Sequence, residues 1–590
     1  MRDQTLLFTQ PVASRQHLAL AAQMLITAVW GTAFFVFSSE ESAIAKISPS
    51  TVARHCAAIT ALLMVLGTIA FLISRRLSYP RQFTLVALCG SAYLVVAGLL
   101  LPLPNQFDMN VSGTGGVVLA NWLASVAIAT GIGMLLHTRF SRLAVWGIVA
   151  FCLSTLAQSV VTFANWREPN SSILRLSTER NIIVVSFDGI QGDIFRDALK
   201  KNSDALDLLK GFTVFQNVIA SSPATVASLA AETIGNQNFK ATAKTTRQLI
   251  DFARQQGLFQ KLNDSGFRVG TYGDYALLFS QSANLGRHLN SHSNLPDLES
   301  LSQVAAARVL GPAASSRLVR RMISLLAALS ANPASPLANE VSNHPGPYWD
   351  RSSILTIEDF NDYTETLDVG SGAPVAHFLH FTFTHFPVDF DADCSFSSNK
   401  LNWYLKHQNR EGQSLEAVCS IKLLERFLSR LKTLGVLDKS LVILKSDHGA
   451  PVAWNQGGGI ASLSIRNSEL WGLGRYLPVL LMRSPDSTEA SALKYDDRPV
   501  ILDDLALTEC LWAKLSGCSV YNGANLLDPT DRGSSTYWIN IVNDAQSSFR
   551  YDDHEAVELN RSSSPLDELR RKLNLEKAGD INSPHRRGAN

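Results

Sequence analysis

The stretch VILKSDHGAP, residues 442–451, joins an apolar, strand-like run to a group of polar side chains. The run over residues 441–444 ends shortly before Asp447, His448 and Gly449. A carboxylate next to an imidazole suits a divalent metal ion, and glycine lets the backbone turn and approach a ligand closely. The pattern predicts that Asp447 and His448 are metal ligands at the end of a buried strand.

A second apolar run ends in the same way, in the stretch NIIVVSFDGIQGD at residues 181–193. Here Asp188 and Gly189 follow the run over residues 181–187. Open α/β sheets bind their ligands at the edge where the carboxyl ends of parallel strands meet. Two strands that end in carboxylates therefore predict a metal-centred active site at that edge, with Asp188 as a ligand. The competing interpretation is that Asp188 caps the helix that follows.

A hydroxyl group completes the predicted site, in the stretch VIASSPATVASLAAETIG at residues 218–235. A strand is predicted over residues 212–219, and a helix from Val226 to about Thr233. Thr225 then lies at the helix N-terminus, where free N–H groups and the helix dipole favour an anion. A hydroxyl in contact with a divalent metal can lose its proton and attack phosphorus or sulfur. Thr225 is therefore the predicted nucleophile and a metal ligand, and its competing role is that of an ordinary N-cap.

The stretch VAHFLHFTFTHFPVDF, residues 375–390, adds a histidine at the end of a further predicted strand. The alternation of side chains places His377 and His385 on one face and His380 on the other. His385 ends the strand, where its side chain can donate to a phosphoryl oxygen or protonate a leaving group. His377 and His380 lie deeper and are expected to be structural.

From residue 181 onward, strand-like and helix-like patterns alternate, which favours a layered α/β domain with a largely parallel sheet. The predicted strands are residues 181–187, 212–219, 267–272, 376–383, 440–446, 477–482 and 537–542, and the predicted helices are residues 193–209, 246–263, 301–329, 414–434 and 502–515. Residues 332–371 are rich in Pro, Ser, Asn and Gly and are expected to form a loop. The charged tail at residues 558–590 is expected to be disordered.

The first third of the chain holds the long apolar runs. Five of them reach the about 20 residues needed to cross a bilayer, at residues 18–37, 56–74, 83–103, 117–136 and 143–163. Residues 1–164 are therefore predicted to form a five-helix transmembrane domain, residues 165–180 a linker, and residues 181–557 an exported catalytic domain. Basic residues in the short loops mark the cytoplasmic side and place the amino terminus there: Arg2, Arg15, Arg75, Arg76, Arg81, Arg139 and Arg142. An odd number of spans then puts the catalytic domain outside the cytoplasm.

Charge and cysteine content agree with this topology. The formal net charge is +1, which offers no argument for nucleic acid as a partner. The exported domain contains four cysteines, and an even number outside the cytoplasm permits two disulfides. The pairing Cys510–Cys518 with Cys394–Cys419 is the most local of the three arrangements, and four free thiols are the alternative.

These motifs, in this order, resemble the alkaline phosphatase superfamily, its sulfatase-like branch in particular. The nearest likeness is to the membrane-bound phosphoethanolamine transferases that modify lipid A and to the lipoteichoic acid synthases, which carry five spans and then an exported sulfatase-like domain. The family's metal-binding acid, nucleophilic threonine, late Asp-His pair and phosphate-side histidine match Asp188, Thr225, Asp447 with His448, and His385. The resemblance implies a metal-dependent enzyme with an α/β sulfatase-like fold.

The chain departs from the sulfatases at the nucleophile. Sulfatases carry a modifiable Cys or Ser in a C/S-x-P-x-R motif, whereas the segment SSPAT at residues 221–225 has Thr225 in place of the arginine. This difference argues against formylglycine chemistry and leaves Ser221 as the second candidate nucleophile. At the position of Asp188 the transferases usually carry Glu. Relatives with two metals need extra histidines after the DHG motif, but none occurs between His448 and His554, so one divalent metal, zinc or manganese, is expected.

The resemblance implies a transferase in the inner (plasma) membrane of a bacterium, with its catalytic domain in the periplasm or outside the cell. The expected reaction moves phosphoethanolamine or phosphoglycerol from a phospholipid donor to a glycan or lipid acceptor of the envelope, through a phosphothreonine at Thr225. One alternative is a membrane-tethered phosphodiesterase or sulfatase. Another is a non-catalytic lipid-binding regulator, against which the intact set of predicted ligands argues.

Overall fold

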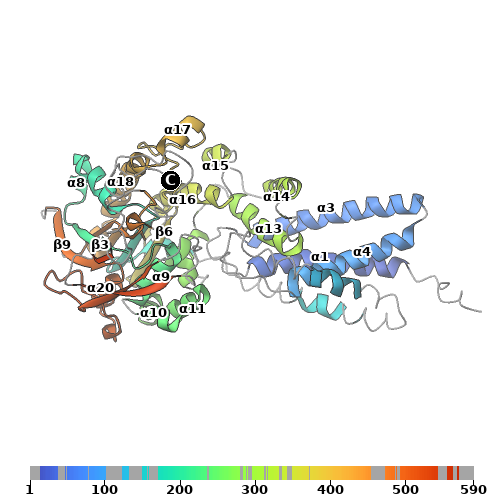
Figure 1. Ribbon diagram of the computed structural model, residues 1–590, viewed down its shortest axis with the longest axis horizontal. Helices are drawn as coiled ribbons and strands as arrows, with labels where there is room; N and C mark the ends of the chain where they lie inside the picture. Colours follow the sequence, from blue (N-terminus) through green and yellow to red (C-terminus); the bar gives the residue numbers. More distant parts are fainter. Residues whose placement is uncertain are drawn as a thin grey trace, which may run out of the picture. The chain divides into compact units, whose positions relative to one another are not determined.

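The computed structural model describes residues 14–37, 47, 49–77 and 79–100, parts of 123–157, and residues 171–569 with gaps, the longest of which are 453–471 and 542–553. The chain forms two compact units, one of residues 1–168 with 292–334 and one of residues 169–291 with 335–590. Figure 1 labels the main elements of both. The segment 292–334 thus belongs with the N-terminal helices, although in sequence it lies inside the second unit.

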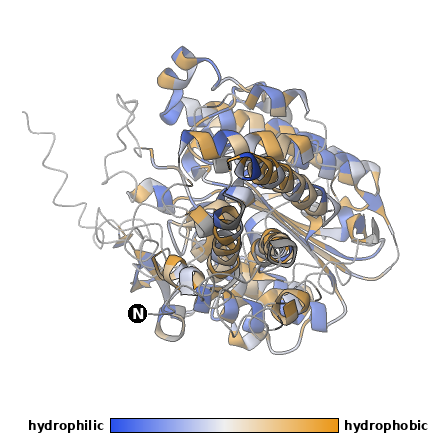
Figure 2. Ribbon diagram, turned by 90° about the vertical axis from the view of Figure 1, so that its right-hand side faces the viewer, coloured by the Kyte–Doolittle hydropathy of each residue, from blue (hydrophilic) through white to orange (hydrophobic). Residues whose placement is uncertain are grey.

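The first unit consists of apolar helices. They are α1 (Ser14–Phe37), α3 (Pro49–Arg76), α4 (Pro80–Val95) with a π-helical turn (Val96–Leu100), α13 (Leu295–Leu310) and α14 (Arg317–Ser330). Among the described residues, Ser50–Arg76 is the one helix long and apolar enough to cross a membrane, while Leu18–Ala33 and Gln82–Gly98 are shorter apolar helices. The helices seen nearly end-on in Figure 2 are largely hydrophobic. Three of the five predicted spans thus coincide with apolar helices, and the other two fall mostly outside the described residues, so the five-helix domain stays a prediction.

The second unit is built on a seven-stranded sheet in the order β4-β6-β2-β7-β8-β3-β9. Its strands are β2 (Asn181–Phe187), β3 (Thr213–Ile219), β4 (Arg268–Tyr272), β6 (Val375–Phe381), β7 (Ser440–Lys445), β8 (Leu480–Arg483) and β9 (Lys494–Ile501). Strand β2 pairs in parallel with β6 on one side and β7 on the other, and all three are buried along their whole length. Such strands read as continuous apolar runs because both faces of the sheet are covered. Strand β8 is antiparallel to β7 and β3.

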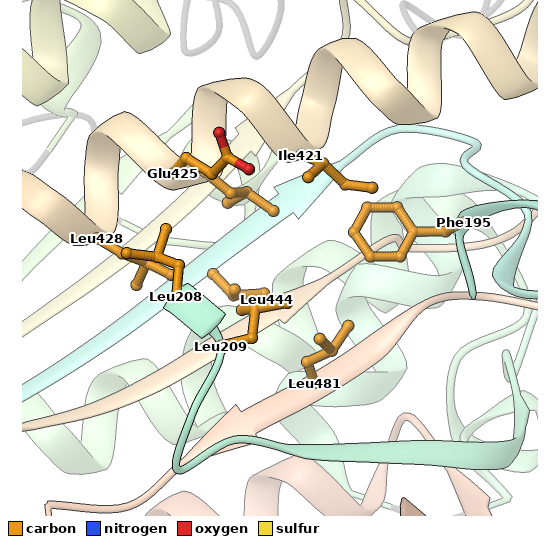
Figure 3. Close-up of a pocket in the computed structure, with 9 residues that line it drawn as sticks. Phe195, Leu208, Leu209, Ile421, Glu425, Leu428, Leu444 and Leu481 are labelled. Carbon is orange, nitrogen blue, oxygen red and sulfur yellow. The ribbon is translucent and has the colours of Figure 1, made fainter. Parts of the chain in front are cut away.

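Helices cover both faces of this sheet. The main ones are α7 (Gly192–Lys200), α8 (Ser203–Leu208), α9 (Thr225–Ile234), α10 (Phe239–Thr242), α11 (Thr246–Gln256), α12 (Leu258–Asp264), α15 (Pro336–Val341), α16 (Tyr348–Thr366), α17 (Leu401–His407), α18 (Arg410–Thr433) and α20 (Asp504–Trp512). Figure 3 shows how α18 meets the sheet, with Ile421 and Leu428 over Leu444 of β7 and Leu481 of β8. This apolar contact holds β7, the strand that leads to Asp447 and His448, in the core.

Both disulfides of the second unit follow the predicted local pairing. Cys394 is bonded to Cys419, and Cys510 to Cys518. The pairing predicted from sequence is therefore confirmed.

The loop predicted for residues 332–371 is wrong. The segment contains α15 and the long helix α16, followed by the short strand β5 (Asp368–Val369), which pairs with β1 (Arg175–Leu176). Residues Ile357, Phe360 and Tyr363 of α16 are buried in the core at intervals of three residues, as on one side of a helix. The turn-forming residues cluster before residue 348, so composition averaged over the whole stretch concealed the periodicity of its second half.

Several other predicted boundaries also change. The helix predicted over 301–329 is two helices, α13 and α14, with Pro312 in the interval between them, and proline does not continue a helix. The helices predicted over 193–209 and 246–263 are likewise pairs, α7 with α8 and α11 with α12. Strand β9 was not predicted, because its sequence KYDDRPVI is polar over its first half, as befits a sheet edge.

The carboxyl-terminal region forms a small separate sheet. Strand β10 (Thr536–Ile541) corresponds to the strand predicted at 537–542 and pairs in antiparallel fashion with β11 (Glu555–Asn560). Beyond β11, the Arg561 guanidinium lies 2.8 Å from the Asp504 carboxylate. Order therefore continues past the predicted start of the tail at residue 558, and most residues of that tail lie outside the described part of the chain.

Candidate metal centre

The predicted site residues Asp188, His385, Asp447 and His448 follow the carboxyl ends of three neighbouring strands, at one edge of the sheet. Because β6, β2 and β7 run in parallel, their carboxyl ends lie together. Asp188 directly follows β2, and Asp447 and His448 follow β7 after one residue. His385 comes four residues after β6 ends, and it lies close enough to Asp188 for the two charges to interact. Thr225 opens helix α9, which follows β3.

The four predicted metal ligands converge. The Thr225 hydroxyl oxygen lies 3.3 Å from Oδ2 of Asp188 and 3.2 Å from Nε2 of His448. Nε2 of His448 lies 3.2 Å from Oδ2 of Asp447 and 4.0 Å from Oδ1 of Asp188. Asp188, Asp447 and His448 are buried and form a group whose ligand atoms can hold a metal ion.

The chemistry of these donor atoms fits a divalent cation. Oδ1 of Asp188 and Oδ2 of Asp447 are buried and accept no hydrogen bond, which is costly for a carboxylate oxygen without a cation. Nδ1 of His448 lies 3.0 Å from the carbonyl oxygen of Gly449, so Nδ1–H donates there and Nε2 keeps its lone pair for a metal. Four ligands around a tetrahedral zinc lie roughly 3.3 Å apart, close to the separations found here.

Two glycines make this geometry feasible. Gly189 has a φ of +69°, in the left-handed region, and its N–H donates to Oδ1 of Asp447 over 3.1 Å. A Cβ on Gly449 would lie 2.0 Å from the carbonyl oxygen of Gly474, so only glycine fits beneath that segment. The glycine at the end of each motif thus lets the backbone approach closely, as predicted from the sequence.

The helix-capping interpretations of Asp188 and Thr225 do not hold. Gln191 is the N-cap of α7, and Ala224 is the N-cap of α9, which leaves Thr225 as the first residue of the helix. Ser221, the second candidate nucleophile, is buried and hydrogen bonded to the carboxylate of Asp503. Its hydroxyl is therefore engaged elsewhere, and Thr225 is the hydroxyl among the buried acids and imidazole.

The charge state of the site suits metal binding. Burial raises the pKa of Asp188, but the neighbouring His385, His380 and His448 outweigh burial and lower the pKa of this carboxyl below its usual range. Burial, followed by the charge of Arg475, lowers the pKa of His448 to about 4. His448 is therefore a neutral imidazole at neutral pH, the form that binds a metal.

His380 was predicted to be structural, but it contacts the site. Its Nε2 lies 3.1 Å from Oδ2 of Asp188 and 3.5 Å from Oδ2 of Asp274. The strand register explains the contact, since His380 pairs with Ser186 of β2, only two residues before Asp188. His377 is structural as predicted, with its ring between the Tyr363 hydroxyl and the Ile173 carbonyl.

A second set of side chains could also hold a metal ion and shares Asp188 with the first set: Asp188, Asp274 and His380. The two groups differ in the state of their imidazole. Burial lowers the pKa of His380, but its hydrogen bond to Asp188 and the charges of Asp447, Asp188 and Asp274 outweigh burial and raise the pKa to about 9. His380 is therefore a hydrogen-bond donor that holds Asp188 in place, whereas His448 offers a lone pair.

A network of buried hydrogen bonds begins at Nδ1 of His380, on the opposite side of the ring from Asp188. Nδ1 of His380 lies 3.2 Å from Oγ of Ser186, which accepts a hydrogen bond from Lys445 over 3.1 Å. Lys445 also pairs with Glu232 at 2.9 Å, and Glu232 accepts from the Tyr275 hydroxyl. These bonds fix the ring orientation of His380 and hence the direction of its bond to Asp188.

Replacing His380 should weaken metal binding without abolishing it. We expect His380→Ala to lower the affinity for Zn²⁺ or Mn²⁺ by about 10- to 100-fold, the usual cost of removing a partner that orients a ligand. His380→Gln, whose amide can still donate to Asp188, should recover part of the loss. Titration calorimetry on the purified full chain measures both, and complete loss of binding in His380→Ala would instead make His380 a ligand.

Arg475 is a second residue that the sequence analysis did not identify. It lies in a short 3-10 helix (Leu473–Tyr476) and is 4% exposed, with Nε buried and without a hydrogen bond. Its carbonyl accepts a hydrogen bond from Gly449 over 3.0 Å, and its guanidinium interacts electrostatically with Asp188 and Asp447. A buried cation thus interacts with the acids of the site, and it comes from a segment that has no recognisable motif.

Comparison with known protein families identifies the family of the second unit. The sulfatase family model matches residues 180–513, more than half of the chain. None of the curated proteins compared matches the chain.

Similar solved structures include enzymes of several kinds, at low similarity. The phosphonate monoester hydrolase of Silicibacter pomeroyi has 10% identity and a TM-score of 0.35, covering 69% of this chain and 96% of its own. The zinc complex of the C-terminal periplasmic domain of EptC from Escherichia coli has 14% identity and a TM-score of 0.35, over 66% and 97%. The lipoteichoic acid synthase LtaP of Listeria monocytogenes has 12% identity and a TM-score of 0.32, over 69% and 93%. The family assignment depends on the sulfatase model alone, and by that match this chain belongs to the sulfatase family.

Proposed function

We propose that this protein is a metal-dependent transferase that moves phosphoethanolamine or phosphoglycerol from a phospholipid to a hydroxyl of an envelope glycan or lipid. One observation carries the proposal. The Thr225 hydroxyl lies within 3.3 Å of both Asp188 and His448, beside two buried carboxylate oxygens that have no hydrogen bond. This arrangement presents an unmodified hydroxyl nucleophile to a cation, which suits attack on phosphorus.

Asp188, Asp447, His448 and Thr225 would hold one divalent cation, for which zinc and manganese both suit the donor set. When bound, the cation lowers the pKa of the Thr225 hydroxyl and offsets negative charge on the phosphoryl oxygens. The position of Thr225 at the start of α9 adds free backbone N–H groups and the positive end of the helix dipole to the same place. The residues of this chain therefore assemble an anion-binding site around the nucleophile.

The proposed reaction has two displacement steps. The Thr225 oxygen, which has already lost its proton when the cation is bound, forms a bond to phosphorus, the bond from phosphorus to the diacylglycerol oxygen breaks, and that oxygen takes a proton from His385. A hydroxyl of the acceptor then gives its proton to His385 and attacks the same phosphorus, which releases Thr225. Attack by water in the second step would make the enzyme a hydrolase.

Arg475 has the charge and the position to bind the transferred group. Its buried guanidinium lies close enough to Asp188 and Asp447 to interact with their charges, and a planar donor of this kind binds phosphate oxygens in pairs. Arg475 also offsets the charge of the two acids, which would otherwise repel an incoming phosphate. We assign it the role of holding phosphoryl oxygens while Thr225 attacks.

Two further observations support an exported, membrane-attached enzyme. The second unit contains two disulfides, which form and persist in oxidising compartments outside the cytoplasm. The first unit contains the apolar helix Ser50–Arg76, which is long enough to cross a bilayer. Attachment to a membrane would keep the site close to a phospholipid donor.

Phospholipid labelled in its head group, with and without an acceptor lipid or glycan, tests the proposal. We expect diacylglycerol release to require the metal and the label to appear on the acceptor. Label that appears only in a water-soluble product would identify a phosphodiesterase. No release under any condition, together with purified protein that binds no metal, would favour the non-catalytic regulator.

Replacing Arg475 should impair both binding and chemistry. We expect Arg475→Ala to lower kcat/KM by on the order of 10²- to 10³-fold, the range for losing one preorganised donor to a developing charge. Arg475→Lys should recover part of the activity but not the paired geometry. Metal stoichiometry, measured by elemental analysis, should remain unchanged in both variants. Unaltered kinetics in Arg475→Ala would show that the guanidinium serves only to balance the buried acids.

A further inference from the structure

Helix α14 presents three different faces. Ile323, Ala327 and Ser330 are buried against the rest of the first unit. A second face carries large apolar side chains at heptad-like spacing, with exposed fractions of 70% for Leu318, 41% for Met322, 64% for Leu325 and 71% for Leu329. A third face carries the exposed Arg317, Arg320 and Arg321 in the first turns of the helix. Contiguous exposed apolar surface of this kind marks a site of contact with a membrane or another molecule.

Buried polar contacts fix α14 to helix α3. Nδ1 of His55 lies 3.2 Å from the Ser330 hydroxyl and Nε2 lies 2.9 Å from the Ser302 hydroxyl of α13. Arg54 donates to the Ser330 carbonyl over 3.3 Å. These partners are more than 240 residues apart in sequence, so the inserted helices are specifically attached to the N-terminal unit (Figure 1).

The attachment lies at one end of the candidate membrane span. His55 and Arg54 are in the second turn of α3, whereas Arg75 and Arg76 occupy its last turn. Arginines favour the cytoplasmic end of a span, so α14 packs near the opposite end. The exposed surface of α3 is also apolar, with Val65, Leu72 and Ile73 each more than half exposed. The apolar face of α14 thus adjoins a surface of membrane-spanning type.

The packed side of α14 also borders an apolar cavity of about 300 Å³. It is lined by residues of α1, α3, α13 and α14, among them Val36, Ile59, Leu301 and Leu326. An apolar cavity stays dry and takes apolar guests. A flexible acyl chain from the surrounding lipid is such a guest, which favours lipid over a folded protein as the neighbour of α14.

We propose that α14 lies in the outer leaflet of the bilayer, with Leu318, Met322, Leu325 and Leu329 among the acyl chains and its arginines against lipid phosphates. An interfacial helix has this composition, apolar on one side and basic on another. The assignment to the outer leaflet depends on the proposed function, in which the second unit lies outside the cytoplasm. The contact of α14 with lipid does not depend on that proposal. The insertion lies between β4 and β6 in the sequence but belongs to the first unit, which therefore gains a lipid-embedded element in addition to the N-terminal spans.

A fluorophore on α14 tests the proposal. The full chain, with Cys56, Cys89 and Cys152 replaced by alanine, receives Leu325→Cys, an environment-sensitive fluorophore, and reconstitution in phosphatidylcholine–phosphatidylglycerol vesicles. We expect blue-shifted emission and loss of most of the fluorescence when the vesicles contain spin-labelled lipid. Ser324→Cys, the neighbouring residue about 100° around the helix, is the matched control and should be quenched much less. Arg247→Cys on the exposed surface of α11 gives the aqueous reference.

Two results would overturn the proposal. Emission and quenching at residue 325 equal to those at residue 247 would place the apolar face in water. Blue-shifted emission that lipid quenchers leave unchanged would show that protein, such as a second copy of the chain, covers this face. If the alanine background does not fold, the same labels are introduced with the native cysteines present, and the signal of the unsubstituted chain is subtracted. The readout does not involve catalysis, so it stands apart from any failure of the proposed reaction.

Discussion

Thr225→Ala should abolish head-group transfer, lowering the release of diacylglycerol by on the order of 10⁴-fold or more, as removal of a catalytic nucleophile does. The reason is geometric, since the Thr225 oxygen lies between Asp188 and His448 and no other hydroxyl identified in the described residues does. Thr225→Ser keeps the oxygen and should retain measurable activity. The assay follows diacylglycerol from labelled phospholipid in membranes that contain equal amounts of each variant.

Ser221→Ala is the matched control for this result. Ser221 is four residues away and buried, but its hydroxyl bonds to Asp503. We expect this variant to keep its activity while losing about 2 kcal/mol of stability, the usual value of a hydrogen bond to a buried charged group. The opposite pattern, with an active Thr225→Ala and an inactive Ser221→Ala, would transfer the nucleophile role to Ser221.

Asp447→Asn should remove both the metal and the activity. Asparagine has the shape of aspartate without its charge, so the site loses one of its two carboxylates. We expect elemental analysis of the full chain to fall from about one divalent metal per molecule to none, and activity to fall by more than about 100-fold, beyond the cost of removing a residue that only orients a ligand. A variant that binds metal as the wild type does would remove Asp447 from the set of ligands.

The same substitution should affect stability in opposite ways with and without metal. In the wild type, metal at 100 times its dissociation constant adds about 2.7 kcal/mol, which the variant cannot gain. In the presence of a chelator, the variant should be at least as stable as the wild type. Removing one of two neighbouring buried carboxylates relieves their repulsion, and the new amide can donate to Nε2 of His448, 3.2 Å from Oδ2 of Asp447. Thermal unfolding with and without a chelator measures both effects, and a large loss of stability in the chelator would contradict this account.

The strands that position the site could be predicted because a strand buried on both faces of a sheet consists almost entirely of apolar residues. Strands β2 and β7 are continuous apolar runs, and each ends beside an acid and a glycine. Parallel strands then bring those ends together whatever lies between them in the chain. Asp188, Asp447 and His448 therefore follow from sequence and sheet topology alone.

Residues placed by strand register or by loop packing could not be predicted. His380 reaches Asp188 because β6 pairs with β2 in one particular register, and Asp274 and Arg475 come from segments without a motif. The polar edge strand β9 lacked a clear periodic signal, and the turn-forming residues before residue 348 concealed the periodicity of α16. The association of α13 and α14 with the N-terminal unit depends on contacts such as His55 with Ser302, which no local pattern reveals.

The most direct test of the central claim is the mass of the peptide that contains Thr225 after incubation with phospholipid donor and no acceptor. The account predicts an added phosphoethanolamine or phosphoglycerol group on Thr225, which disappears when acceptor is supplied and is absent from Asp447→Asn. An unmodified Thr225 in protein that releases diacylglycerol, or a modification on another residue, would contradict it.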